Sequence, residues 1–439
     1  MTSVATNSEL LHHAAARVVP GGTHSNSRLR DPHPIYFERA EGAYLFDVDG
    51  NSYLDFTMGN AAVVLGHGHP TVTAAVADAV AAGLTAGYET RTAVEAVQLL
   101  ASIIPGFGKA RFANTGTEAV MHALRIARGA TGRDRIAKVE GAYHGWYDDV
   151  WVSCWAAPSE LGPPDRPRSP AGSRGLSVHA DETLVLPFND VEATARLVRE
   201  HGADLAAVIV EPVLIDIGWI PARQEYLEGL RALTTEFGAL LLFDELLTGF
   251  RVAPGGAREV YGVVPDLTVY GKALANGYPL AAVEGRSDLL DLTDAAAGGS
   301  VSYVGTFNGH AIALAASVAS LELLRDGSAQ RRLQELTERL QAGIRQLGEE
   351  YGVAVVAAGG GGHFQPYFTA GPVTDYRSAL ASSPAHYRAF AQALARHDIL
   401  VAEKPLLHSA LSLAHTEEHV DALLAAAEEA FDKIAGARG

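Results

Sequence analysis

Cysteine is nearly absent from this sequence, because Cys154 is the only one in 439 residues. One thiol cannot form an intrachain disulfide, and it cannot supply the thiolates of a structural zinc site, so we expect no bound metal of that kind. Long apolar runs are also missing, since none approaches the roughly 20 residues that cross a bilayer. Residues 1–10 lack the basic and apolar blocks of a secretory signal. These absences predict a cytoplasmic protein without a membrane anchor.

Basic residues are in deficit. Lys and Arg total 34 against 51 Asp and Glu, which gives a formal net charge of −17. An acidic surface repels the phosphates of nucleic acids and of anionic membranes, so we expect small-molecule ligands and no nucleic-acid or membrane partner. The apolar share of 48% and the charged share of 19% are ordinary for a globular protein. The length suits one large domain and a smaller one.

The middle of the chain, between about residues 110 and 310, alternates short β-rich runs with amphipathic segments of helical length. We expect strands at 111–113, 136–139, 207–210, 240–243 and 267–270, and helices at 117–128 and 224–237 that end at Gly129 and Gly238. This alternation predicts an α/β fold with a mostly parallel sheet flanked by helices. We assign residues 61–310 to this large domain.

The two ends of the chain predict a smaller α+β domain. Residues 34–56 indicate a hairpin around Asp49-Gly50-Asn51. Later segments indicate helices at 311–324, 329–351 and 417–434 and strands at 353–356 and 363–368. We therefore assign residues 1–60 and 311–439 to the smaller domain. Residues 156–182, rich in Pro, Ser, Gly and Arg, predict a long loop.

Asp244 and Lys272 are the strongest chemical signal. Each closes a short apolar run that predicts a buried strand, Leu242-Phe243 before Asp244 and Val269-Tyr270 shortly before Lys272. A lysine amine can condense with an aldehyde to form a Schiff base, and a buried carboxylate can keep a pyridine nitrogen protonated. Taken singly, the aspartate could cap a helix and the lysine could be a surface amine. At the carboxyl ends of consecutive parallel strands the two would face one crevice, which predicts a pyridoxal 5′-phosphate (PLP) site.

Asn114-Thr115-Gly116-Thr117-Glu118 lies between a predicted strand and a predicted helix. Backbone N–H groups at the helix start, with the hydroxyls of Thr115 and Thr117, could hold a phosphate. An ordinary N-cap is the alternative for this motif alone. The downstream Asp244 and Lys272 favour the phosphate site.

Other residues could complete the site. The ring of Tyr143 could lie on a flat cofactor, with His144 beside it, although a core histidine is the equal alternative. Leu246 would face the same side of its strand as Asp244 and could pack on the opposite ring face. Gly305-Thr306 offers another amide and hydroxyl for a phosphate, or forms a plain loop.

Several motifs together resemble the class III aminotransferases, with the branch of glutamate-1-semialdehyde aminomutase as the most similar. The resemblance runs from about residue 10 to residue 430. It is carried by Val19-Pro20-Gly21-Gly22, 42–55, 65–70, 114–119, Tyr143-His144-Gly145, Val210-Glu211-Pro212, 244–252, 265–268 and Gly271-Lys272. It implies fold type I and two active sites at a homodimer interface.

The resemblance also implies roles for individual residues. Lys272 would form the Schiff base, Asp244 would meet the pyridinium nitrogen and Tyr143 would stack on the ring. Thr115, Gly116 and Thr117 would bind the phosphate, and Thr306 would reach the phosphate of the partner subunit's site. Glu211 would line the pocket. Ser25 and Arg28 match entrance positions that meet a substrate carboxylate, which suits an arginine fork, although a surface guanidinium is the alternative.

Two departures from the aminomutase pattern concern the substrate side. Leu407 stands where the aminomutase has a pocket carboxylate, and Asn60 stands where it has a tryptophan. We therefore expect amino-group transfer between two substrates, an amine or amino acid and a carbonyl acceptor, by a ping-pong mechanism. An aminomutase is the first alternative, a decarboxylase or racemase the next, and a non-catalytic relative the last.

Overall fold

The computed structural model describes residues 6–177, 180 and 182–436. Seven strands form the main sheet in the order β4-β12-β11-β10-β7-β5-β6. They are β4 (Lys109–Ala113), β5 (Arg135–Val139), β6 (Leu184–Leu186), β7 (Leu205–Val210), β10 (Leu240–Asp244), β11 (Leu267–Tyr270) and β12 (Ala281–Gly285). Only β12 runs antiparallel to its neighbours. The predicted mostly parallel sheet is confirmed, and the sequence analysis missed β6 and β12.

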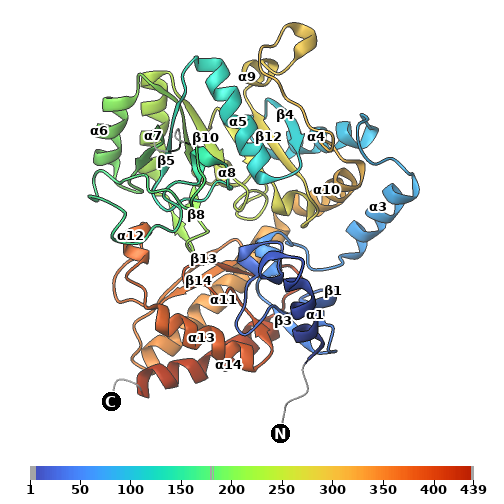
Figure 1. Cartoon of the computed structure of the whole chain (residues 1–439), viewed down its shortest axis with the longest axis vertical. Helices are drawn as coiled ribbons and strands as arrows, with labels where there is room; N and C mark the ends of the chain where they lie inside the picture. Colours follow the sequence, from blue (N-terminus) through green and yellow to red (C-terminus); the bar gives the residue numbers. More distant parts are fainter. Residues whose placement is uncertain (1–5, 178–179, 181, 437–439) are drawn as a thin grey trace.

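Helices cover both faces of the sheet because alternate residues of its central strands point to opposite sides. Leu240 and Leu242 of β10 pack in one core with α5 (Gly116–Thr131). Leu241 and Phe243 pack in another core with α6 (Val191–His201) and α7 (Gln224–Phe237). Figure 1 shows these layers in the upper part of the molecule.

The predicted helices are present, with one wrong boundary. Helix α7 ends as expected at Gly238, whose φ is 64°. Helix α5 does not stop at Gly129 but continues to Thr131 and ends at Gly132 in the left-handed region. A Cβ on Gly129 would lie 2.4 Å from Val301 Cγ2, so this glycine permits close packing and does not terminate the helix.

The two ends of the chain meet in one sheet. The predicted hairpin is confirmed as β2 (Tyr44–Asp47) and β3 (Ser52–Asp55), with β1 (Phe37–Glu41) at its edge. Strand β15 (Ile399–Leu400) adds to β3 in parallel. A second small sheet contains β13 (Val356–Gly360), β14 (His363–Tyr367) and β16 (Ser409–Ala410). The strand expected at 353–356 therefore begins only at its last residue.

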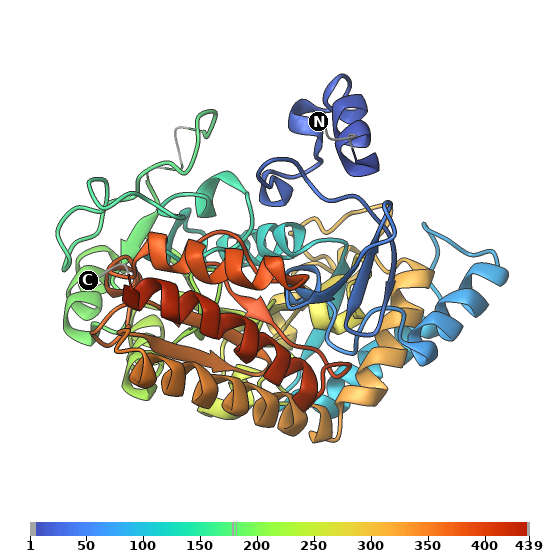
Figure 2. The ribbon, with the colours of Figure 1, turned by 90° about the horizontal axis from the view of Figure 1, so that it is seen from below.

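The predicted C-terminal helices are α10 (Ala311–Leu324), α11 (Ser328–Glu350) and α14 (Glu417–Gly436), and α13 (Pro384–Arg396) is added to them. Helices α11, α13 and α14 lie side by side in Figure 2, and α14 packs on both α11 and α13. Helix α10 packs instead on α3 (Pro70–Ala81) and α4 (Arg91–Ile103). The domain limits at residues 60 and 310 stay a prediction.

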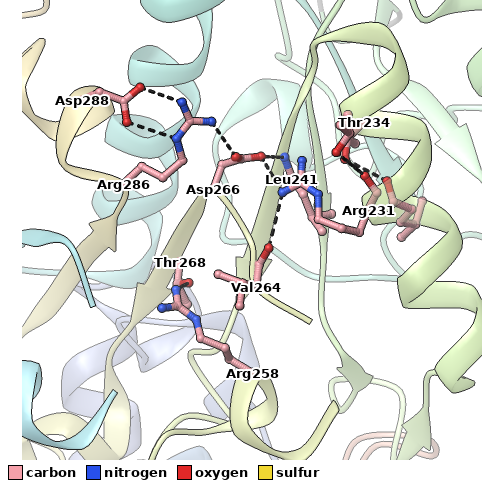
Figure 3. Close-up of polar contacts among 11 residues, drawn as sticks. Arg231, Thr234, Leu241, Arg258, Val264, Asp266, Thr268, Arg286 and Asp288 are labelled. Carbon is pink, nitrogen blue, oxygen red and sulfur yellow. Dashed lines mark hydrogen bonds and ion pairs between the residues drawn. The ribbon is translucent and has the colours of Figure 1, made fainter. Parts of the chain in front are cut away.

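The amino ends of β10 and β11 are joined by a polar network around Asp266, shown in Figure 3. Its Oδ2 accepts hydrogen bonds from Arg231 Nη1 and the Leu241 main-chain N, each at 2.8 Å. Its Oδ1 accepts one from Arg286 Nη1 at 3.0 Å. Asp266 is buried, so these contacts fix the strand pair at the edge opposite to its carboxyl end.

The long loop predicted at 156–182 contains no α-helix and no strand in its described part, although residues 180 and 182 have a 3-10 helical conformation, and residues 178, 179 and 181 lie outside the described residues. Arg377 anchors its first half through hydrogen bonds to the carbonyls of Leu161 and Gly162. Over the residues that the structure describes, every helix is too short or too polar to cross a membrane.

Candidate active site

Asp244 and Lys272 follow two neighbouring strands. Asp244 is the last residue of β10, and Lys272 comes two residues after β11 ends at Tyr270. The strands run parallel with Leu242 opposite Leu267, so both functional groups lie at the carboxyl edge of the sheet. Lys272 has a φ of 48°, a left-handed conformation that non-glycine residues rarely adopt and that is typical of functional sites.

A cavity of about 280 Å³ lies at this edge, and both residues line it. Most of the residues that we predicted for the cofactor also line it. These are Thr115, Gly116, Thr117, Tyr143, Glu211 and Leu246. The structure thus brings segments more than 150 residues apart in the sequence to one hollow of the size of a small ligand.

The carboxyl group of Asp244 is held in place by two contacts. Its Oδ1 accepts a hydrogen bond from the Leu246 main-chain N at 3.1 Å, and its Oδ2 lies 2.8 Å from His144 Nδ1. Burial lowers the pKa of His144, and Asp244 opposes that shift. A neutral imidazole therefore donates its Nδ1–H to the carboxylate. Asp244 is oriented towards the cavity by a partner that carries no charge.

The amino end of α5 forms another wall. Thr115 is its N-cap, and its Oγ1 accepts the Glu118 main-chain N at 3.2 Å. Glu118 in turn accepts the main-chain N–H groups of Asn114 and Thr115. The N-cap alternative is therefore real, yet the Thr115 hydroxyl can still donate, and the N–H groups of Gly116 and Thr117 point along the positive end of the helix dipole.

Gly116 has no room for a side chain. A Cβ there would lie 2.6 Å from Leu246 Cδ1. The same leucine would meet a Cβ on Gly271 at 2.5 Å. Leu246 therefore packs between the helix start and the residue before Lys272, and only glycine permits both approaches.

Tyr143 forms an aromatic wall. Its ring stacks on Trp155 with centroids 5.4 Å apart and meets the edge of Trp151 at 5.9 Å. Its main-chain N donates to Glu211 Oε1 at 2.9 Å. Burial, followed by the charges of Asp216 and its neighbours, raises the pKa of the Tyr143 hydroxyl well above its usual value. The Tyr143 side chain is therefore neutral, and its ring is supported by the rings of Trp151 and Trp155.

Asp216 is a cavity residue that the sequence analysis missed. It lies in the turn between the short strands β8 (Val213–Leu214) and β9 (Ile220–Pro221). Burial, with repulsion from Asp216 and Asp244, raises the pKa of Glu211 well above its usual value. A signal was available, since an acidic residue in a glycine-containing turn directly after Glu211 interrupts an apolar stretch.

Five predicted residues lie away from this cavity. Ser25 Oγ accepts the Ser27 main-chain N at 3.4 Å, and Arg28 and Asn60 are exposed. Gly305 and Thr306 line a separate hollow of about 830 Å³. In the single chain, these residues do not touch the Lys272 pocket.

The cavity suits PLP on three structural grounds. A lysine and a buried carboxylate face one hollow from adjacent strands. A helix start with main-chain N–H groups and threonine hydroxyls lies beside them, and Gly116 permits Leu246 to pack against this helix start, where a Cβ would lie 2.6 Å from the leucine. A neutral aromatic ring supplies a flat wall. The residues present therefore fit an aldehyde, a ring nitrogen, a phosphate and a planar ring.

Comparisons with known proteins agree with this geometry. The model of the family "Aminotransferase class-III" matches residues 26–381. The chain is 39% identical over 420 residues to a glutamate-1-semialdehyde 2,1-aminomutase of Desulforudis audaxviator (strain MP104C). This alignment covers 95% of each of the two proteins. The fold of the chain matches an omega-transaminase from Sphaerobacter thermophilus with a TM-score of 0.93 and 33% identity over 99% of this chain and 98% of that one. A transaminase with PLP bound matches with a TM-score of 0.90 and 31% identity over 100% of both chains.

Proposed function

The chain belongs to the class III aminotransferase family, and from that premise we propose the roles of its residues in PLP-dependent amino transfer. The observation that carries the assignment is the convergence of Asp244 and Lys272 on one cavity from adjacent parallel strands. The protein transfers an amino group from an amine or amino acid to a carbonyl acceptor. When bound, PLP supplies an aldehyde that condenses with amines and a ring that accepts electrons from the substrate carbon.

With PLP bound, Lys272 would be the residue that holds it covalently. Its Nζ, when not engaged in that bond, would act as a base that takes a proton from the substrate carbon and as an acid that returns one. Its position after a strand end and at the start of a tight turn keeps the amine within the cavity. Because one group performs both transfers, its loss removes turnover.

Asp244 stabilises positive charge on the ring nitrogen. Its carboxylate is fixed by the Leu246 main-chain N–H and by neutral His144. Since His144 carries no positive charge, the carboxylate keeps its full attraction for a protonated nitrogen. His144 thus orients the group that polarises the cofactor.

Thr115, Gly116 and Thr117 bind the phosphate at the start of α5, where N–H groups and the helix dipole favour an anion. Tyr143 stacks on the ring, and Leu246 contacts it from the other side. Glu211 lines the pocket and fixes the Tyr143 main chain. These contacts hold the ring so that the substrate bond to be broken stands in a constant orientation.

We further propose a cytoplasmic homodimer with shared active sites, in which Gly305 and Thr306 reach the phosphate of the partner's site. Both are exposed, and neighbouring Val304 and Phe307 are 75% and 57% exposed, which gives a partner subunit two apolar side chains to cover. Asn114 Nδ2 donates to Asn308 Oδ1 at 3.2 Å, which ties this segment to the phosphate loop. Light scattering should give twice the 46.2 kDa chain mass.

Substrates reach the pocket from the N-terminal side in this proposal, with Ser25, Arg28 and Asn60 at the entrance. A carboxylate on the substrate would meet the Arg28 guanidinium, which has no ion-pair partner among the described residues. Glu403, in the C-terminal loop, pairs instead with Arg30 at 3.0 Å. An Arg28→Ala variant should raise KM for carboxylate substrates and spare amines without a carboxyl group.

An aminomutase is the alternative function, favoured by the relative from Desulforudis audaxviator. Leu407, which is half-buried, argues against an aminomutase because its apolar side chain supplies no charge where the aminomutase pattern has a pocket carboxylate. Single-turnover experiments separate the two. Transfer releases a keto product and leaves the amino group on the protein-bound cofactor, whereas isomerisation returns the amine to the same molecule and needs no acceptor.

A further inference from the structure

Three carboxyl groups line the cavity, and one of them has no partner. Glu211 and Asp244 are tied to main-chain N–H groups, and Asp244 also contacts His144. The carboxyl of Asp216 accepts no hydrogen bond from any residue in the described part of the chain, although it faces the hollow that holds Lys272. A free acid beside a functional amine calls for a chemical role.

The turn that carries Asp216 is held firmly by its main chain. The Ile215 carbonyl accepts a hydrogen bond from His408 Nδ1 at 3.0 Å. The Asp216 carbonyl accepts one from Trp155 Nε1 at 3.4 Å, and the next carbonyl accepts one from the Tyr367 hydroxyl at 2.7 Å. The backbone is therefore fixed on both sides of Asp216 while its side chain is left for the cavity.

The charges around Asp216 couple it to Lys272. Burial raises the pKa of the Asp216 carboxyl, the Lys272 ammonium opposes the rise, and the Asp244 carboxylate adds to it. Tyr143 and Glu211 also line this space, and Asp216 pushes both towards their neutral forms. The buried imidazoles of His363 and His408 are affected by the Lys272 charge as well. Burial, with repulsion from Lys272, lowers the pKa of His408 to about 3, so this imidazole carries no charge near neutrality.

We propose that Asp216 is a positioning residue that sets the protonation state of the Lys272 Nζ through its charge across the cavity that both residues line. An ionised Asp216 stabilises the Lys272 ammonium, whereas a neutral residue at this position lets Lys272 release its proton more readily. Asp216 is suited to this role because, unlike Glu211 and Asp244, its carboxyl has no hydrogen-bond partner in the described part of the chain that would draw its charge away. The inference rests on the proposed function only in taking Lys272 as the reacting amine.

The test measures the pKa of Lys272 in full-length protein freed of cofactor. Trace labelling with acetic anhydride across a pH series, followed by mass spectrometry of the Lys272 peptide, gives this value without any turnover. Asp216→Asn and Asp216→Ser should each lower the pKa of Lys272 by one unit or more. Below the pKa, this change makes the labelling of Lys272 at least tenfold faster than in the parent protein, because a larger fraction of the amine is unprotonated. The pKa of Lys272 in Asp216→Glu should stay closer to the parent value than in the asparagine or serine variant. In Asp432→Asn, a change at an exposed position of α14, it should equal the parent value.

A pKa of Lys272 within 0.3 unit of the parent in a folded Asp216→Asn or Asp216→Ser protein overturns the proposal. So does an Asp216→Glu protein that shifts as far as the variants without a carboxyl group. Circular dichroism establishes folding, and the serine variant serves if the asparagine variant does not fold. Because labelling needs neither cofactor nor substrate, a failed amino-transfer assay would count against the proposed function and leave this result intact.

Discussion

Asp244 Oδ2 lies 2.8 Å from His144 Nδ1, and both side chains are buried. The imidazole is neutral because burial lowers its pKa, so it orients the carboxylate without cancelling its charge. The charge of Asp244 is then available to a protonated ring nitrogen in the cavity. We therefore expect the reaction to depend on the charge of this carboxylate more than on its shape.

Asp244→Asn should retain the hydrogen-bonding shape and lose the charge. We expect turnover to fall by at least about 10²-fold, the order of loss when a group that stabilises transition-state charge is removed. Cofactor should still bind. Steady-state kinetics with the cofactor content measured by absorbance checks this, and exposed Asp432→Asn is the control. Near-parent turnover in a fully loaded Asp244→Asn protein would disprove the role of the charge.

Gly116→Ala should weaken cofactor binding. The added Cβ would lie 2.6 Å from Leu246 Cδ1, so the leucine or the helix start must move. Overpacking of this kind costs about 1–3 kcal/mol, which corresponds to a rise in the cofactor Kd of roughly 5- to 150-fold if the phosphate loop shifts. Fluorescence titration with PLP measures it. Gly229→Ala is the control, because its Cβ would meet only ordinary contact at 3.5 Å from Val191.

His415 should make stability depend on pH. Burial, followed by the charge of His419, lowers the pKa of His415 from 6.5 to about 4, and its Nδ1 accepts the Ser412 main-chain N at 3.0 Å. Between these values the unfolded chain binds the proton and the folded one does not. The free energy of unfolding therefore falls as the pH drops from 6.5 to 4, by up to about 1.4 kcal/mol per pH unit from this group.

His415→Gln should remove that share of the slope in urea unfolding measured across the same pH range. The exposed His13 supplies the matched control, since His13→Gln should leave the slope at its parent value. An unchanged slope in the His415→Gln protein would contradict the assignment of a neutral buried imidazole.

Asp266→Ala should destabilise the fold and spare the chemistry. The substitution leaves the guanidinium groups of Arg231 and Arg286 and the Leu241 N–H without their shared acceptor (Figure 3). Removing one partner of such a buried network costs about 3 kcal/mol. Thermal and urea unfolding measure the loss, while the cofactor Kd should not change. Asp288→Ala, which breaks only an exposed pair with Arg286, should stay within about 0.5 kcal/mol of the parent.

The sequence predicts well those features that depend on neighbouring strands. Once Leu240–Asp244 and Leu267–Tyr270 are assigned to parallel strands, the meeting of Asp244 and Lys272 at one edge follows from sheet geometry. The helix start at Thr115 follows in the same way from a strand that precedes an N-cap residue. Local patterns are sufficient because each of these residues ends or begins a regular element.

Features that depend on tertiary contacts could not be predicted. Gly129 looks like a helix stop, yet it serves a close approach to Val301, 172 residues later. The sequence shows Asp216 as an acidic residue in an apolar stretch, but its place in the cavity could not be predicted, because it depends on a turn anchored by His408 and Tyr367 from distant segments. The entrance residues Ser25 and Arg28 stay predictions, since their contribution requires a substrate or a second chain.

The most direct test of the account is the Lys272→Ala variant. We expect it to bind PLP without a covalent bond and to lose turnover by at least about 10³-fold, because one amine serves as attachment point, base and acid. Borohydride reduction followed by peptide mass spectrometry, with the exposed Lys433→Ala protein as control, should find the cofactor on Lys272 in the parent and on no lysine in the variant. Cofactor reduced onto another lysine, or undiminished turnover in Lys272→Ala, would contradict the account.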